Sequence, residues 1–84
     1  MADVTHEMLD SAIRRAEETI YENKEAMRRE GSVADPELKE IMAFEGYIEE
    51  IERLYLYIDH DRNPAVIQKQ VDACSDEVKN LLFR

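Results

Sequence analysis

Residues that would support a disulfide framework, a loop-rich fold or a membrane span are scarce in this 84-residue sequence. It contains one cysteine, two glycines, two prolines and no tryptophan. A single cysteine cannot form an internal disulfide, and no apolar run approaches the ~20 residues that a membrane-spanning helix needs. A charged-then-apolar leader for secretion is also missing. We therefore expect a helical, cytoplasmic protein that makes no contact with a membrane.

Signatures of catalytic and cofactor-binding sites are missing as well. Gly31 and Gly46 stand alone, so no glycine-rich loop is available to hold a phosphate group. Cys74 lies on an apolar stripe without a basic residue at helical spacing to activate it, which predicts an inert core thiol rather than a nucleophile. We expect a protein that is not an enzyme and that uses no cofactor.

Two histidines and two aspartates are the candidate metal ligands: His6, Asp59, His60 and Asp61. Adjacent residues on a helix point about 100° apart, so the run from Asp59 to Asp61 cannot face one ion while the helix continues. A histidine at the C-terminal end of a helix also interacts favourably with the helix dipole. We therefore interpret this run as a helix end, and we predict no metal site.

A capping residue precedes a proline at two points, and each pair predicts a helix start. Gly31 can end one helix in the left-handed conformation, Asp35 can cap the next, and Pro36 fits its first position. Asn63 and Pro64 repeat this arrangement. The predicted helices are residues 5–30, 36–60 and 64–83. Their short polar connections favour antiparallel neighbours.

Each predicted helix carries a stripe whose spacings alternate between three and four residues, which is typical of coiled-coil seams. The stripes are Leu9, Ile13, Ala16, Ile20, Asn23 and Met27 in the first helix, Ile41, Phe44, Ile48, Ile51, Tyr55 and Ile58 in the second, and Ile67, Val71, Cys74, Val78 and Leu81 in the third. Three such stripes can be buried together only in a bundle. We predict one all-α domain over residues 1–84, an antiparallel three-helix bundle with coiled-coil-like seams. Its polar seam residue, Asn23, is interpreted as fixing the register between helices.

Acidic charge dominates the sequence and is concentrated in the second predicted helix. The formal net charge is −9. Residues 35–61 hold nine acidic and two basic side chains, whereas residues 62–84 hold three acidic and four basic ones. This balance disfavours direct binding to nucleic acid, whose phosphates need lysine and arginine. It favours a protein partner with a basic surface.

The outer half of the second helix carries the candidate partner-binding residues. Met42 and Leu56 share one line along the helix, Tyr57 adjoins Leu56, and acidic residues lie between the two ends. Methionine and aromatic side chains surrounded by charges are typical of interfaces. We predict a contact surface, for another protein or for a second copy of the chain, made of Met42, Glu45, Glu49, Glu52, Leu56 and Tyr57. The alternatives are a solvated face with salt-bridged edges, or burial of this helix on both sides; in either case Tyr47 and Leu54 widen the buried stripe.

Three function classes follow from these features. The favoured class is a small non-enzymatic protein that inhibits or regulates a larger partner through the acidic second helix. In size and charge, though not in any motif, the chain resembles small phage-encoded inhibitors, including those of nucleic-acid-binding complexes. Such a face could imitate a phosphate strand. The alternative is a helical chaperone or a structural subunit of an assembly such as a secretion system. An enzyme built on the run 59–61 comes third. A salt-sensitive complex would favour the first class over the second.

Overall fold

The computed structural model describes residues 4–31, 35–60 and 63–83. Within these ranges the chain forms α-helices and no strand. The helices are α1 (His6–Glu30), α2 (Asp35–His60), α3 (Pro64–Asp72) and α4 (Asp76–Phe83). The predicted all-α class is therefore confirmed. The predicted single helix over 64–83 is wrong, because the chain turns between α3 and α4.

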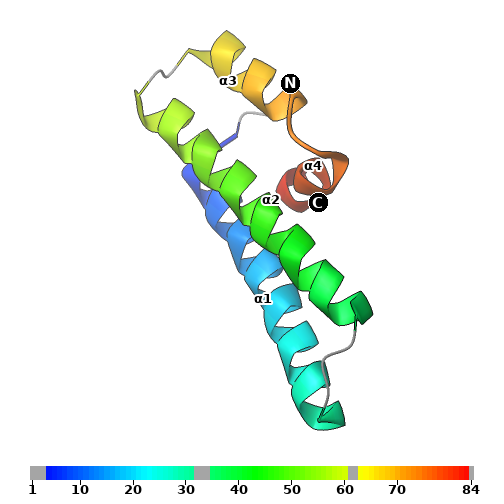
Figure 1. Cartoon of the computed structure of the whole chain (residues 1–84). Coiled ribbons are helices and arrows are strands. Elements are labelled where there is room, and N and C mark those ends of the chain that lie inside the picture. Colours follow the sequence, from blue (N-terminus) through cyan, green and yellow to red (C-terminus); the bar gives the residue numbers. More distant parts are fainter. Residues whose placement is uncertain (1–3, 32–34, 61–62, 84) are drawn as a thin grey trace.

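α1 and α2 form an antiparallel hairpin that runs the length of the molecule (Figure 1), which measures 48 × 21 × 20 Å. α3 and α4 lie against one half of this hairpin, the half that holds the start of α1 and the end of α2 (Figure 1). α4 is seen nearly end-on, so it crosses the hairpin instead of running along it. The described chain is thus a long hairpin with two short helices on one half, and it lacks the third long helix of the predicted bundle.

The helix ends use the residues that the sequence indicates. Gly31 ends α1 in the left-handed conformation with φ 70°, and its N–H donates to the carbonyl of Arg28 at 3.3 Å. Asn63 caps α3, since its side-chain oxygen accepts the Ala65 N–H at 3.0 Å. α2 begins at Asp35, but the predicted capping role of this side chain lies outside the described residues.

The turn that divides the predicted third helix is held by α2. Ala73 ends α3. The Ser75 N–H and hydroxyl then donate to the two carboxylate oxygens of Glu50, at 3.1 and 3.0 Å. α4 begins directly afterwards with Asp76 and Glu77, and acidic residues in a first turn interact favourably with the helix dipole. A side chain from the hairpin therefore caps a new helix where the apolar pattern predicts a continuous one.

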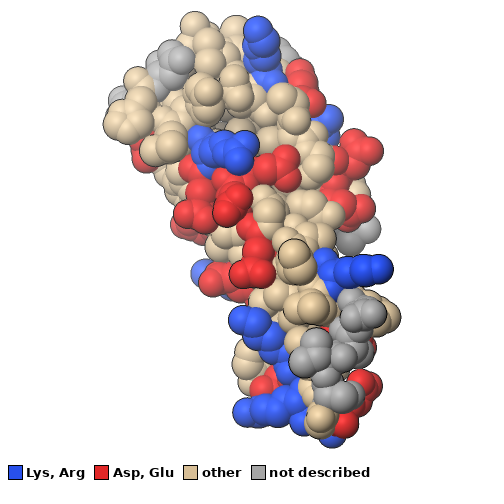
Figure 2. Space-filling view, viewed as in Figure 1, with Lys and Arg blue, Asp and Glu red and all other residues tan. Residues whose placement is uncertain are grey.

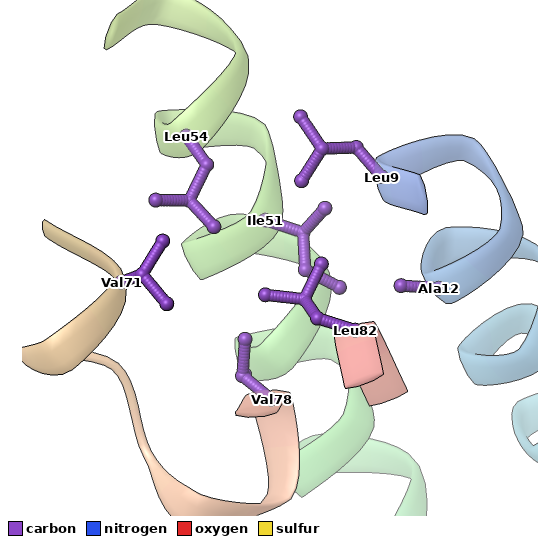
Figure 3. Packing of buried hydrophobic residues seen from close by; sticks show 7 residues of the cluster. All are labelled: Leu9, Ala12, Ile51, Leu54, Val71, Val78 and Leu82. Atoms are coloured by element: carbon purple, nitrogen blue, oxygen red, sulfur yellow. The ribbon is translucent and has the colours of Figure 1, made fainter. Parts of the chain in front are cut away.

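The hydrophobic core lies where the four helices meet. Seven buried side chains form it: Leu9, Ala12, Ile51, Leu54, Val71, Val78 and Leu82. They point toward one another from all four helices, and Ala12 faces Leu82 (Figure 3). The small side chain of Ala12, fully buried, lets α4 approach α1 closely.

The predicted seams are buried only in part. In α2, Ile41 and Ile51 are buried whereas Phe44 and Ile48 are half-buried, because a two-helix hairpin covers each stripe from one side only. Leu54 is buried, as the widened stripe predicts. The third stripe ends at Leu81 in the prediction, but Leu81 is only half-buried and its neighbour Leu82, which was not predicted, is buried, since the turn changes the phase of α4.

Within the described residues, the Asn23 side chain bonds inside α1 and not to another helix, which differs from the predicted register role. Its Nδ2 donates to the carbonyl of Thr19 at 2.8 Å, one turn earlier in α1. The residue is half-buried, so this bond satisfies an amide that would otherwise be costly to remove from water. The polar seam position is therefore accommodated within its own helix.

Candidate functional site

One exposed line of side chains runs along the outward face of α2, and we call it the acidic stripe. Its members are Leu38, Met42, Glu45, Glu49, Glu52 and Leu56, all exposed. They are three or four residues apart, so they follow one face of the helix. Leu38, Met42 and Leu56 are 40%, 64% and 59% exposed, respectively. Five of the six predicted partner-binding residues lie on this line. Leu38 was not predicted, although its spacing of four from Met42 indicates it.

The carboxylates of the acidic stripe are left without partners. Within the described residues, Glu45, Glu49 and Glu52 make no hydrogen bond or ion pair, whereas Glu25 of α1 contacts Arg28 at 2.7 Å. Figure 2 shows Asp and Glu side chains gathered over the middle of α2. The salt-bridged edges of the solvated-face alternative are therefore not found on the described part of this stripe, and no ion pair there neutralises its negative charge.

Tyr57 is not a member of the acidic stripe. It lines a groove at the C-terminal half of α2, next to Leu56, the last residue of the stripe. The groove has a volume of about 460 Å³ and is lined by Arg53, Leu56, Tyr57 and His60. A smaller hollow of about 80 Å³ shares Arg53 and Tyr57 and reaches Cys74 beyond α3. Tyr57 is half-buried while Leu56 faces water. The alternative of burial on both sides is thus wrong for Leu56 and holds in part for Tyr57.

Two of the four candidate metal ligands come together at the end of the hairpin. His6 Nε2 lies 2.6 Å from Asp59 Oδ1, and the Tyr55 hydroxyl donates to the His6 carbonyl at 3.4 Å. This contact links the start of α1 to the end of α2. His60 lines the separate groove, and Asp61 lies outside the described residues. In the part of the chain that is described, no three His, Cys, Asp or Glu residues are arranged to hold a metal ion.

Cys74 is half-buried in the turn between α3 and α4. Its thiol donates to the carbonyl of Gln70 at 3.3 Å. Burial raises the pKa of the Cys74 thiol, Glu50 raises it further, and the opposing effects of Lys79 and Arg53 are smaller. The thiol therefore stays protonated at neutral pH, which agrees with the predicted inert thiol.

A third hollow, of about 330 Å³, lies where α4 meets the hairpin. It is lined by Arg15, Glu18, Thr19, Glu22, Phe44, Glu77, Asn80 and Leu81. The Arg15 guanidinium donates to the carbonyl of Leu81 at 2.8 Å and so holds the end of α4 against α1. This contact gives Arg15 a structural role.

None of the helices in the described residues combines the length and the hydropathy that crossing a membrane requires. The features that bear on function are on the surface of α2: in the described residues, an acidic stripe without ion pairs lies beside an apolar groove that also carries Arg53 and His60. Comparison of the chain with known protein families, with curated proteins and with solved structures gave no match.

Proposed function

We propose that the chain is a small, non-enzymatic protein-binding module that inhibits or regulates a larger cytoplasmic protein with a basic surface. One observation carries the proposal: Glu45, Glu49 and Glu52 face solvent, and within the described residues they have no partner. Adjacent like charges repel one another, and a basic surface would relieve this repulsion. Charge complementarity of this kind accelerates association and selects among partners.

Apolar residues at the two ends of the acidic stripe support a protein as the partner. Leu38 and Met42 lie before the carboxylates and Leu56 after them. At ~1.5 Å per residue the stripe is about 27 Å long. A few apolar anchor side chains usually supply most of the binding energy of a contact, and complementary charges supply specificity and speed association. The complementary surface would be basic in the middle and apolar at both ends.

The finer proposal is that the stripe substitutes for nucleic acid. Glu45, Glu49 and Glu52 are separated by steps of about 4.5–6 Å along the helix axis, given a rise of ~1.5 Å per residue. Phosphates of one DNA strand follow one another every ~3.4 Å along the duplex axis. Three carboxylates at this spacing could occupy part of a basic groove that binds a phosphate strand. The partner would then be a nucleic-acid-binding protein, inhibited by occlusion of that groove.

Affinity capture from an extract of the source organism tests the proposal with three baits. The first is the unaltered chain. The second carries Glu45→Gln, Glu49→Gln and Glu52→Gln. The third carries the same change at three exposed glutamates of α1: Glu17, Glu18 and Glu22. Because the two variants have equal net charge, a basic protein retained by the first and third baits but not by the second would support the stripe as the site. Equal capture by all three baits would rule the stripe out.

The salt dependence of the complex distinguishes the charged binding site from the alternative function, and competition by DNA tests whether the stripe substitutes for nucleic acid. A complex formed by the stripe carboxylates should dissociate as salt is raised, because exposed charge pairs are screened. A complex that resists salt and is lost on Met42→Ser with Leu56→Ser would favour the alternative function, a helical chaperone or structural subunit. Duplex DNA should compete for the captured protein if the stripe substitutes for nucleic acid. A captured protein without affinity for nucleic acid would contradict that finer proposal.

A further inference from the structure

We infer that the C-terminal half of α2 is a self-association surface, on which two copies of the chain pack antiparallel about Leu56. The surface consists of exposed side chains within four residues of Leu56: Glu52, Arg53, Leu56, Asp59 and His60. This inference goes beyond the proposed function and does not depend on it. It rests on the apolar groove and on the order of charges along the helix.

An exposed leucine beside an apolar groove forms the centre of this surface. Leu56 is 59% exposed. It lines the groove of about 460 Å³ together with Tyr57, Arg53 and His60. When a second α2 lies antiparallel across this groove, the two Leu56 side chains meet at the twofold axis, each beside the other copy's Tyr57. Both leucines are then removed from water, which is the main favourable contribution to such contacts.

The charges on either side of Leu56 are complementary under this symmetry. In an antiparallel pair centred on Leu56, a residue three positions before it faces the residue three positions after it on the second copy. Arg53 therefore faces Asp59 of the second copy, and Glu52, four positions before, faces His60 of the second copy. The twofold axis repeats both pairs. A parallel pair would instead place Arg53 against Arg53.

The groups that form these pairs are available in the single chain. Within the described residues, Arg53 and His60 make no hydrogen bond or ion pair, and they are the two basic side chains of α2 beyond Glu52. Asp59 contacts His6 through Oδ1 and is about half exposed, so its second oxygen can accept from Arg53 of the second copy. As far as the described residues go, two basic side chains of α2 without partners thus lie beside the acidic stripe.

A second copy meets the chemistry of the groove. The groove is lined by apolar and basic side chains, which suit an apolar side chain flanked by carboxylates, and Leu56 between Glu52 and Asp59 is such a segment. The contact covers about three turns of one helix, less than the ~800 Å² per partner of a stable complex. A weak dimer is therefore expected, with a dissociation constant of about 10–500 μM. Because Glu52 and Leu56 also belong to the acidic stripe, self-association and partner binding there would exclude each other.

Sedimentation equilibrium of the full chain tests the inference through a charge swap. In a dimer of the Arg53→Asp variant, an aspartate faces Asp59 of the second copy. In a dimer of the Asp59→Arg variant, an arginine faces Arg53 of the second copy. The twofold axis repeats each of these like-charged pairs. Each variant alone should associate at least about tenfold more weakly than the unaltered chain, because like charges face each other. An equimolar mixture of the two variants restores opposite charges at both positions. The mixture should regain the affinity of the unaltered chain.

Matched controls separate this geometry from a general effect of charge. Lys39→Asp and Glu40→Arg make the same charge changes at exposed positions near the other end of α2, and they should leave association unchanged. Leu56→Ser should weaken association without altering the circular dichroism spectrum, because this side chain lies outside the core. The Leu56→Ser variant still tests the interface if Asp59→Arg disturbs the contact between Asp59 and His6.

Three results would overturn the inference. The first is an unaltered chain that remains monomeric at about 1 mM, a concentration above the whole expected range of the dissociation constant, at which most chains should be dimeric. The second is a dimer that persists in Arg53→Asp and Leu56→Ser, because its interface would lie elsewhere. The third is a mixture of the charge-swapped variants that associates no better than each alone, because the antiparallel pairing would then be wrong.

Discussion

Glu50 of α2 caps the start of α4 through Ser75, 25 residues further along the chain: its carboxylate accepts the Ser75 N–H at 3.1 Å and the hydroxyl at 3.0 Å. α4 has eight residues, too few for a helix that is stable in isolation. Its place depends on this cap, on the hydrogen bond from Arg15 to the Leu81 carbonyl, and on burial of Val78 and Leu82 in the core. One carboxylate therefore connects the hairpin to the element that completes the core.

Removal of this cap should destabilise the protein. Glu50→Ala is expected to lower the free energy of unfolding by about 1–2 kcal/mol, since a helix cap and two charge-assisted hydrogen bonds are lost. Urea unfolding followed by circular dichroism measures the change. Glu49→Ala, which removes an exposed carboxylate without a partner in the described residues, should change stability by less than about 0.5 kcal/mol. Equal effects of the two substitutions would show that the cap contributes nothing.

The contact between Glu50 and Ser75 also explains where sequence reasoning fails for the fold. The first two predicted helices, 5–30 and 36–60, agree with α1 and α2 to within one residue at each end, because glycine and proline signals accompany long apolar stripes there. The third stripe continues through Cys74 without a proline or glycine. A local signal is present in Ser75 followed by two acidic residues, but the carboxylate that secures the break comes from α2.

The part of the candidate site that depends only on the helical period of α2 could be predicted from the sequence. The positions of Met42, Glu49 and Leu56 on one outward line follow from the helical period, and the structure places them there. The half-burial of Tyr57 depends on the packing of α3, which the periodicity of α2 does not specify. The proximity of His6 and Asp59 likewise arises from the pairing of α1 with α2.

Two isoleucines of the same predicted seam should differ in their contribution to stability. Ile51 is fully buried in the core, whereas Ile48 is half-buried. Ile51→Ala should lower the free energy of unfolding by about 2–5 kcal/mol, the usual cost of a large-to-small change in a core. Ile48→Ala should cost about 1–2 kcal/mol, in proportion to the smaller apolar area it buries. Urea unfolding of the two variants makes the comparison, and an equal cost would contradict the half-burial of Ile48.

The Cys74 thiol should make stability depend on alkaline pH. Burial, with Glu50, raises the thiol pKa above its ordinary value of 9.0, so the folded chain holds this proton more tightly than the unfolded chain. The resulting stabilisation is complete below the unfolded pKa and is lost as pH rises through the folded pKa. The difference in unfolding free energy between the unaltered chain and Cys74→Ala should therefore fall as the pH rises above the ordinary thiol pKa of 9.0. A difference that stays constant or grows over this range would contradict the raised pKa.

Gly46 lies in the interior of α2 at an exposed position, and an alanine there should stabilise the chain. A Cβ atom at Gly46 would meet nothing within 4 Å. Glycine in a helix interior costs about 0.5–1 kcal/mol relative to alanine. Gly46→Ala should therefore raise the free energy of unfolding, measured by urea unfolding, by about that amount; a decrease would contradict the open helical setting.

The same variant is an informative bait in the capture experiment, because Gly46 adjoins Glu45 on the acidic stripe. Reduced capture despite higher stability would place the partner's backbone close to Gly46, and unchanged capture would confine the contact to the stripe itself.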